Sequence, residues 1–175
     1  MVKIGQQRRA FHAAGHAVAA VACGLSVDSI SLPADDTAGA TYERAILSAA
    51  ADPAAQVEGL RIDIIVTLAG FAAQMRLRPA KRNFVECADD LKLAQAWASW
   101  AAFIANVMSI AEFTIDGKIE LSDEEQAYAD QLLKQCQERA DQIVAERWDD
   151  IVTVADALLD RAVLNAEDID ALLRA

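Results

Sequence analysis

Glycine and proline are scarce in this chain, with only seven and three of them among 175 residues. Both residues interrupt helices, whereas alanine, which recurs throughout, favours helix more than any other residue, so helix is predicted over nearly the whole chain. Apolar residues make up 54% of the total, which is ample for a packed core and argues against intrinsic disorder. We therefore predict a mainly α fold, built as one domain or as a tight pair of helical subdomains.

Local start and stop signals divide the chain into six predicted helices. The signals include an aspartate-proline start, two capping boxes and a glycine directly after the first helix. We expect Gly59 to interrupt the second helix, and we expect the third, which is apolar almost all round, to lie in the core. The predicted helices cover 5–23, 53–75, 89–104, 122–147, 151–161 and 165–173.

One part of the chain has the alternation of a strand. Residues 27–32 alternate between apolar and polar, 33–39 supply turn residues, and 40–42 can return as a second strand. A small β-hairpin or sheet is therefore predicted beside the helices. The stretch 76–83 contains a proline and four basic residues, and it predicts a loop.

The charge is distributed unevenly. Residues 1–111 hold ten acidic and ten basic side chains, whereas residues 112–175 hold seventeen and six, which accounts for the net charge of −11. This acidic excess argues against a nucleic-acid partner, because such proteins need a basic surface. We divide the predicted domain into a metal-site half, 1–111, and an acidic C-terminal helical part, 112–175. The charged segments of this domain are expected to form either a solvated surface or a docking surface in a homo-oligomer.

Three cysteines, Cys23, Cys87 and Cys136, are widely spaced and form no C-x-x-C pair. Neither a disulfide framework nor a thiolate zinc site is indicated, and a reducing compartment suits the pattern. The N-terminus lacks a signal-type apolar segment, and the most apolar stretch, 94–111, is marginal in length for a bilayer span. We expect a cytoplasmic protein with no membrane span in this chain.

The two histidines of the chain, His12 and His16, are four residues apart in the first predicted helix. This spacing puts both imidazoles on one helix face, as the H-E-x-x-H motif does to bind zinc. Here the string is His-Ala-Ala-Gly-His, so Ala13 stands where that motif has glutamate. A catalytic zinc site also needs a third protein ligand, and without one a chance pair of histidines is the alternative.

The string His-Ala-Ala-Gly-His-Ala resembles the H-E-A-G-H-A motif of the FtsH family of membrane AAA+ zinc proteases, and it differs only at Ala13. Residues 87–94, Cys-Ala-Asp-Asp-Leu-Lys-Leu-Ala, are similar to the segment that supplies the third zinc ligand in that family. The resemblance makes Asp90 this ligand. Asp89 stands where the family usually has asparagine, and it is expected either to accept a hydrogen bond from a ligating histidine or to cap the helix.

The likeness extends over most of the chain. Residues 38–41 resemble a G-x-T strand of the family, and 148–169 resemble its C-terminal helix pair. Residues 68–74 are similar to its L-x-G-R-A-A-E segment, with Phe71 and Gln74 as departures. No G-x-x-x-x-G-K-[ST] motif occurs, so the ATPase module of the family is absent. The resemblance implies a standalone peptidase domain that acts on polypeptides, either on loose segments or with a separate ATPase partner.

The resemblance also implies the chemistry. Zn²⁺ is held by two histidines and an aspartate, and a glutamate after the first histidine takes a proton from water as general base. Ala13 cannot do this, so the chain is predicted to retain metal and to lack appreciable proteolysis. Two explanations of Ala13 stay open, namely a natural pseudopeptidase that binds peptides or oligomerises and an inactive variant of an active zinc metallopeptidase. A third interpretation of the chain is a helical scaffold in which the histidine pair is accidental.

Overall fold

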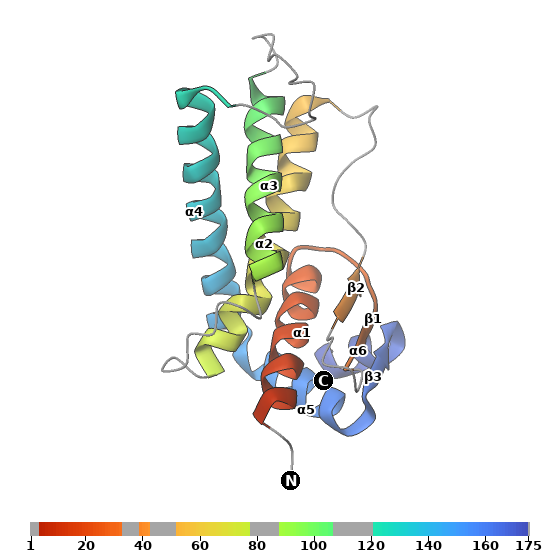
Figure 1. Ribbon diagram of the computed structural model, residues 1–175. Helices are drawn as coiled ribbons and strands as arrows, with labels where there is room; N and C mark the ends of the chain where they lie inside the picture. Colours follow the sequence, from red (N-terminus) through yellow and green to blue (C-terminus); the bar gives the residue numbers. More distant parts are fainter. Residues whose placement is uncertain (1–3, 33–38, 43–51, 78–87, 107–120, 175) are drawn as a thin grey trace.

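The computed structural model of the chain describes residues 4–32, 39–42, 52–77, 88–106 and 121–174 (Figure 1). The described part is mainly helical with a small antiparallel sheet, as the sequence predicts. Its elements are α1 (Ile4–Ala22), β1 (Val27–Ser31), β2 (Gly39–Tyr42), α2 (Pro53–Leu77), α3 (Ala88–Ala105), α4 (Asp123–Glu146), α5 (Trp148–Arg161), β3 (Val163–Asn165) and α6 (Ala166–Leu173).

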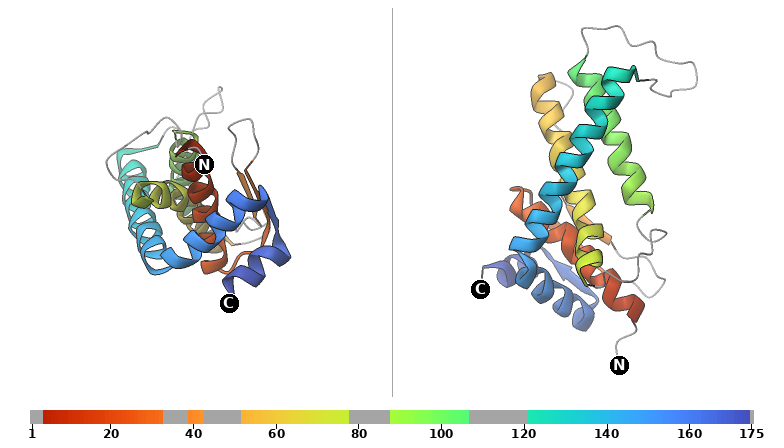
Figure 2. Two further views of the ribbon diagram at one scale, coloured as in Figure 1. Left: turned by 90° about the horizontal axis from the view of Figure 1, so that it is seen from below. Right: turned by 90° about the vertical axis from the view of Figure 1, so that its left-hand side faces the viewer.

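Helices α2, α3 and α4 stand side by side as a tall bundle, and α1, α5, α6 and the sheet form a base beneath it (Figures 1 and 2). Helix α1 packs against the lower part of α2, and it also contacts α5 and the sheet. The N-terminal end of α3 comes down to α1. The candidate site lies at this meeting point.

The three strands pair in the order β2-β1-β3, and both neighbouring pairs are antiparallel. Ile30 in the central strand pairs with Ala40 of β2 and with Leu164 of β3, and the Ile30 side chain is fully buried. Strand β3 was not predicted, because three residues are too few to show an alternation. Through β3, the acidic C-terminal part completes a sheet that the N-terminal part begins, so the two parts share one core.

Local signals set several helix ends where the sequence predicts them. Gly24 follows α1 with a φ of +83°, a left-handed conformation that glycine adopts without strain. The Asp52 side chain accepts a hydrogen bond of 3.0 Å from the backbone of Ala55 at the start of α2. Both capping boxes form, one at Ser122 before α4 and one at Asn165 before α6.

Three expectations about the helices were wrong. Helix α2 is continuous through Gly59, because its packing against α1, α3 and α4 outweighs the roughly 1 kcal/mol that glycine costs in a helix relative to alanine. Helix α3 is not buried all round, since the side chains of Leu93 and Trp100 are 38% and 43% exposed. Helix α5 begins at Trp148, three residues before the predicted start at 151.

Several predicted features lie outside the described residues, namely the turn at 33–38, the loop at 78–83, Cys87 and the boundary between 111 and 112. Arg76, from the basic stretch, lies within α2, and its guanidinium lies 4.8 Å from the centre of the Trp148 ring. Among the helices described, none is long and apolar enough to cross a membrane.

Candidate metal centre

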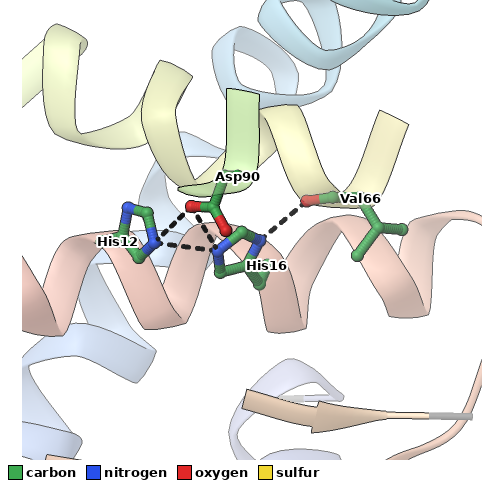
Figure 3. A network of polar contacts seen from close by, with 4 residues as sticks. All are labelled: His12, His16, Val66 and Asp90. Carbon is green, nitrogen blue, oxygen red and sulfur yellow. Dashed lines mark hydrogen bonds and ion pairs between the residues drawn. The ribbon is translucent and has the colours of Figure 1, made fainter. Parts of the chain in front are cut away.

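The two histidines lie on one face of α1, where that helix packs against α2 (Figure 3). The surrounding residues are mostly alanine and valine, which favour close helix packing because their side chains are small. The Nε2 atoms of His12 and His16 are 2.9 Å apart, and the rings meet edge to face. His16 is buried and His12 is partly buried.

Asp90, in the first turn of α3, completes the cluster (Figure 3). Its Oδ2 lies 3.0 Å from Nε2 of His12 and 3.7 Å from Nε2 of His16. One ligand atom from each of the three residues lies within 4.8 Å of the others. Within the described ranges, no other group of three or more His, Cys, Asp or Glu residues converges in this way.

Helix α2 orients the ring of His16 through the ring nitrogen that does not face His12 and Asp90. Nδ1 of His16 donates a hydrogen bond to the carbonyl oxygen of Val66, 2.8 Å away. Because a carbonyl can only accept, neutral His16 carries its proton on Nδ1 and keeps the Nε2 lone pair facing His12 and Asp90. Histidines that bind metal in proteins are usually held by such a bond from their other ring nitrogen.

Two glycines inside helices make room for this arrangement. A Cβ at Gly70 would lie 2.4 Å from Nε2 of His16, far closer than atoms can approach. A Cβ at Gly15 would lie 2.7 Å from the carbonyl oxygen of Ala69 and 2.7 Å from Cβ of Ala73. Glycine is less favourable than alanine in a helix, so the close approach of α1 and α2 explains why glycine stands at both positions.

The surroundings of the cluster favour a neutral His12 and an ionised Asp90. Burial lowers the pKa of His12 and the nearby His16 lowers it further, against the opposing effects of Asp90 and of a hydrogen bond with the Gln74 side chain. Burial raises the pKa of Asp90, but hydrogen bonds with His12 and His16 outweigh burial and hold that pKa well below its usual range. At neutral pH His12 therefore offers an uncharged nitrogen and Asp90 a carboxylate, which are the states in which these side chains bind a divalent metal.

The geometry fits a tetrahedral metal site. Two ligand atoms that each lie about 2.0–2.1 Å from a tetrahedral zinc ion are about 3.3 Å apart. The separations of 2.9, 3.0 and 3.7 Å among the three ligand atoms lie on both sides of this value. Two imidazoles and one carboxylate are also a donor set that catalytic zinc sites use with the fourth position open. The residues present therefore fit zinc, although the same donors bind other divalent metals.

The structure brings together His12, His16 and Asp90, the three predicted ligands, and places Asp89 elsewhere. The Asp89 side chain is fully exposed and lies 3.5 Å from the ammonium of Lys92. Asp89 was expected either to accept a hydrogen bond from a ligating histidine or to cap the helix, and the hydrogen bond from Nδ1 of His16 goes to the backbone of α2. Ala13, where the resembling family has glutamate, is fully buried and carries no group that could transfer a proton.

Sequence reasoning missed the contribution of α2. Val66 acts through its backbone carbonyl, which a residue type does not reveal. Gly70 carried a usable signal, because a glycine inside a strongly predicted helix indicates a close contact with another backbone or ring. Gln74 was noted only as a departure from the family segment, yet its side chain hydrogen-bonds His12.

Comparisons with known proteins do not assign a function to this site. No protein-family model matches the chain, and no curated protein matches it in sequence. The functional interpretation therefore rests on the motif and on the arrangement of the site itself.

Proposed function

We propose that this chain binds one divalent metal ion, zinc by its donor set, through His12, His16 and Asp90. The observation that carries the proposal is the convergence of three ligand atoms from two helices, with one imidazole already oriented by a backbone carbonyl. The resemblance to the FtsH family implies the same three residues as ligands. A motif in the sequence and an arrangement in space thus support one site.

The scaffold, in this proposal, is that of an FtsH-type zinc metallopeptidase without its general base. A zinc ion in the site would polarise a peptide carbonyl and activate water, which is its Lewis-acid contribution. Ala13 has no atom that could hold a proton beside a substrate, and general acid–base catalysis contributes roughly 10²–10⁴-fold to such reactions. We expect the chain to bind metal and to hydrolyse peptide bonds very slowly or not at all.

Two neighbouring aspartates provide a matched test of the site. Asp90→Asn and Asp89→Asn make the same chemical change, but only Asp90 faces the histidines. In a titration of metal-free protein with Zn²⁺ against a chromophoric chelator, the wild type and Asp89→Asn should each bind one ion per chain. Asp90→Asn should bind far more weakly. Equal zinc binding by Asp90→Asn and the wild type would overturn the proposal.

The second candidate function is a non-catalytic module that binds a peptide or assembles with copies of itself. Ala13 favours this function, because it places an inert side chain next to His12 at the position where a hydrolase of this kind needs a base. The fold and the metal ligands are common to both candidates. Only the behaviour of position 13 separates them.

Two substitutions at this position distinguish the candidates. Ala13→Glu supplies a general base, and Ala13→Gln supplies a neutral side chain of the same size. Cleavage of an unfolded protein by zinc-loaded Ala13→Glu, and not by Ala13→Gln, supports the peptidase scaffold. If both variants fold, bind zinc and leave the substrate intact, the binding module is the better assignment.

The partners follow from the same proposal. The substrate or ligand is a polypeptide, and the resemblance adds a homo-oligomer and a separate ATPase as partners to look for. The wide spacing of the cysteines supports a reducing compartment, and so we place the protein in the cytoplasm.

A further inference from the structure

A small pocket lies between α2 and α4, which pack against each other (Figure 2), and it shares no residue with the metal cluster. Its volume is about 250 Å³. Pockets for drug-sized ligands measure roughly 300–1,000 Å³, so this one suits a smaller molecule or one end of a peptide. The lining residues of α4 recur at spacings of three and four, so they share one face of that helix. The lining residues are Arg61 of α2 and Tyr128, Gln131, Leu132 and Gln135 of α4.

The polar groups around the pocket are mainly hydrogen-bond donors. Nη1 of Arg61 donates to Oε1 of Gln135, 3.3 Å away, so the NH₂ group of that glutamine can donate to a ligand. Within the described part of the chain, no hydrogen bond or ion pair involves the side chain of Tyr128 or of Gln131. The hydroxyl of one and the amide of the other can therefore donate as well, while Leu132 adds an apolar wall.

The guanidinium of Arg61 is incompletely satisfied by its neighbours. Its Nε is buried and makes no hydrogen bond to a described residue, although Oε2 of Glu58 lies 3.3 Å away. The Glu58 side chain is 63% exposed, and ion pairs that are open to solvent contribute little. A guanidinium is always charged, and its N–H groups match the two oxygens of a carboxylate. Arg61 thus presents to the pocket a charged donor suited to a carboxylate.

We infer that this pocket binds a carboxylate that carries a small apolar tail. The carboxylate oxygens accept hydrogen bonds from the terminal nitrogens of Arg61 and from the amides of Gln131 and Gln135. The tail lies against Leu132 and the ring of Tyr128. A small organic acid and the C-terminal end of a peptide both offer this chemistry.

The charge of the pocket selects a singly charged ligand. Arg61 is the only charged residue among those that line it, and the chain as a whole carries a net charge of −11. A dianion such as phosphate would therefore meet more repulsion than a single cation offsets. A neutral amide of the same shape would lack the charge that strengthens hydrogen bonds to a guanidinium.

Side-chain NMR of the full chain tests the inference, with benzoate as the probe. Titration with benzoate should shift the Nε–H signal of Arg61 and the NH₂ signals of Gln131 and Gln135. Benzamide, which is neutral and similar in shape, and inorganic phosphate should each leave these signals nearly unchanged. No shift with benzoate, or equal shifts with benzamide or phosphate, would overturn the inference.

Substitutions around the pocket give a second readout. Arg61→Met should weaken benzoate binding about tenfold or more, because hydrogen bonds to a charged group are the stronger ones. Gln131→Met, at an exposed position, should weaken it less. Glu58→Gln should strengthen it, because this change removes the carboxylate that competes for Arg61. The control is Arg161→Met, the same change at an exposed arginine that pairs with Asp168 at 2.9 Å, and it should bind benzoate as the wild type does. Wild-type affinity in Arg61→Met would overturn the inference.

Two short peptides that end in leucine identify the source of the carboxylate. One has a free C-terminus, and the other has the same sequence with an amidated C-terminus. If the free acid binds at least as tightly as benzoate and more tightly than the amide, a chain end is the ligand. If the free acid binds no better than the amide while benzoate binds, a small organic acid is the ligand.

The inference does not depend on the metal site. Arg61→Met should bind zinc as the wild type does, because Arg61 is not among the proposed ligands. A failure to bind benzoate would therefore leave the proposed function intact, and a failure to bind zinc would leave the pocket intact.

Discussion

Helix α1 meets two helices of the bundle, α2 and α3, in different ways. Its contact with α2 is the most extensive between any two described elements, and it is close enough that glycine is required at Gly15 and at Gly70. Its contact with α3 is sparse, and what the two helices share is the polar cluster of His12, His16 and Asp90. Packing holds α1 to α2, whereas the polar contacts of Asp90 with the two histidines link α1 to α3.

This difference assigns separate tasks to the two contacts. The α1–α2 contact fixes two imidazoles on a rigid support, with Val66 setting the orientation of one ring. The α1–α3 contact brings the carboxylate of Asp90, which is 26% exposed, from a helix that rests mainly on α2 and α4. A metal ion bound by all three residues would therefore join two helices that otherwise touch little.

The largest expected effect is stabilisation by zinc. At a free zinc concentration 100-fold above the dissociation constant, binding to the folded state alone adds about 2.7 kcal/mol to the free energy of unfolding. Urea unfolding with and without zinc should show this gain for the wild type and not for Asp90→Asn. Hydrogen exchange should slow on zinc addition in the first turns of α3. The same gain in both proteins would show that zinc does not join α1 to α3 through Asp90.

The α1–α2 contact should be sensitive to a single methyl group. Gly15→Ala places a Cβ 2.7 Å from the backbone oxygen of Ala69, so α1 must shift, at a cost of about 1–3 kcal/mol in unfolding free energy. Gly5→Ala is the control, because a Cβ there meets only the end of the Arg9 side chain, at 3.7 Å. The control should be neutral or slightly stabilising. A Gly15→Ala protein as stable as Gly5→Ala would contradict the close contact.

A smaller effect is expected far from the site, at the start of α4. Ser122→Ala removes the N-cap and should lower the free energy of unfolding by about 1 kcal/mol without changing zinc affinity. Hydrogen bonds from the backbone and side chain of Ser122 lower the pKa of Glu125. The stability from this carboxylate is therefore present above its unfolded pKa, about 4.3, and is lost as the pH falls through the lower folded value.

Urea unfolding at pH 7 and at pH 3 measures the loss of stability in Ser122→Ala and its dependence on pH. The difference between the wild type and Ser122→Ala should shrink at the lower pH. A difference that grows on acidification would show that the capping box does not depend on an ionised glutamate.

Features encoded locally were predictable from the sequence. The capping boxes at Ser122 and Asn165 and the stop at Gly24 each depend on a few adjacent residues, and all three form. The histidine pair was also local, because helical spacing alone puts His12 and His16 on one face. Asp90 came from the resemblance of its segment, and the spatial cluster agrees with it.

Features that depend on distant partners were not predictable. Strand β3 exists because β1 offers it an edge, and its three residues carry no signal of their own. The oxygen that orients His16 belongs to a backbone 50 positions away, so no pattern near the histidines indicates it. Asp89 and Asp90 differ only in the side of α3 on which they fall. Asp89 points to solvent and Lys92, and Asp90 points to the histidines.

The identity of the metal ligands tests the central claim most directly. X-ray absorption at the zinc edge of the loaded wild-type protein should show nitrogen and oxygen neighbours at about 2.0–2.1 Å, with outer scattering from two imidazole rings. Sulfur neighbours at about 2.3 Å would contradict the account, because they would place the ion on cysteine. A first shell without imidazole would contradict it equally, because His12 and His16 are the only histidines in the chain.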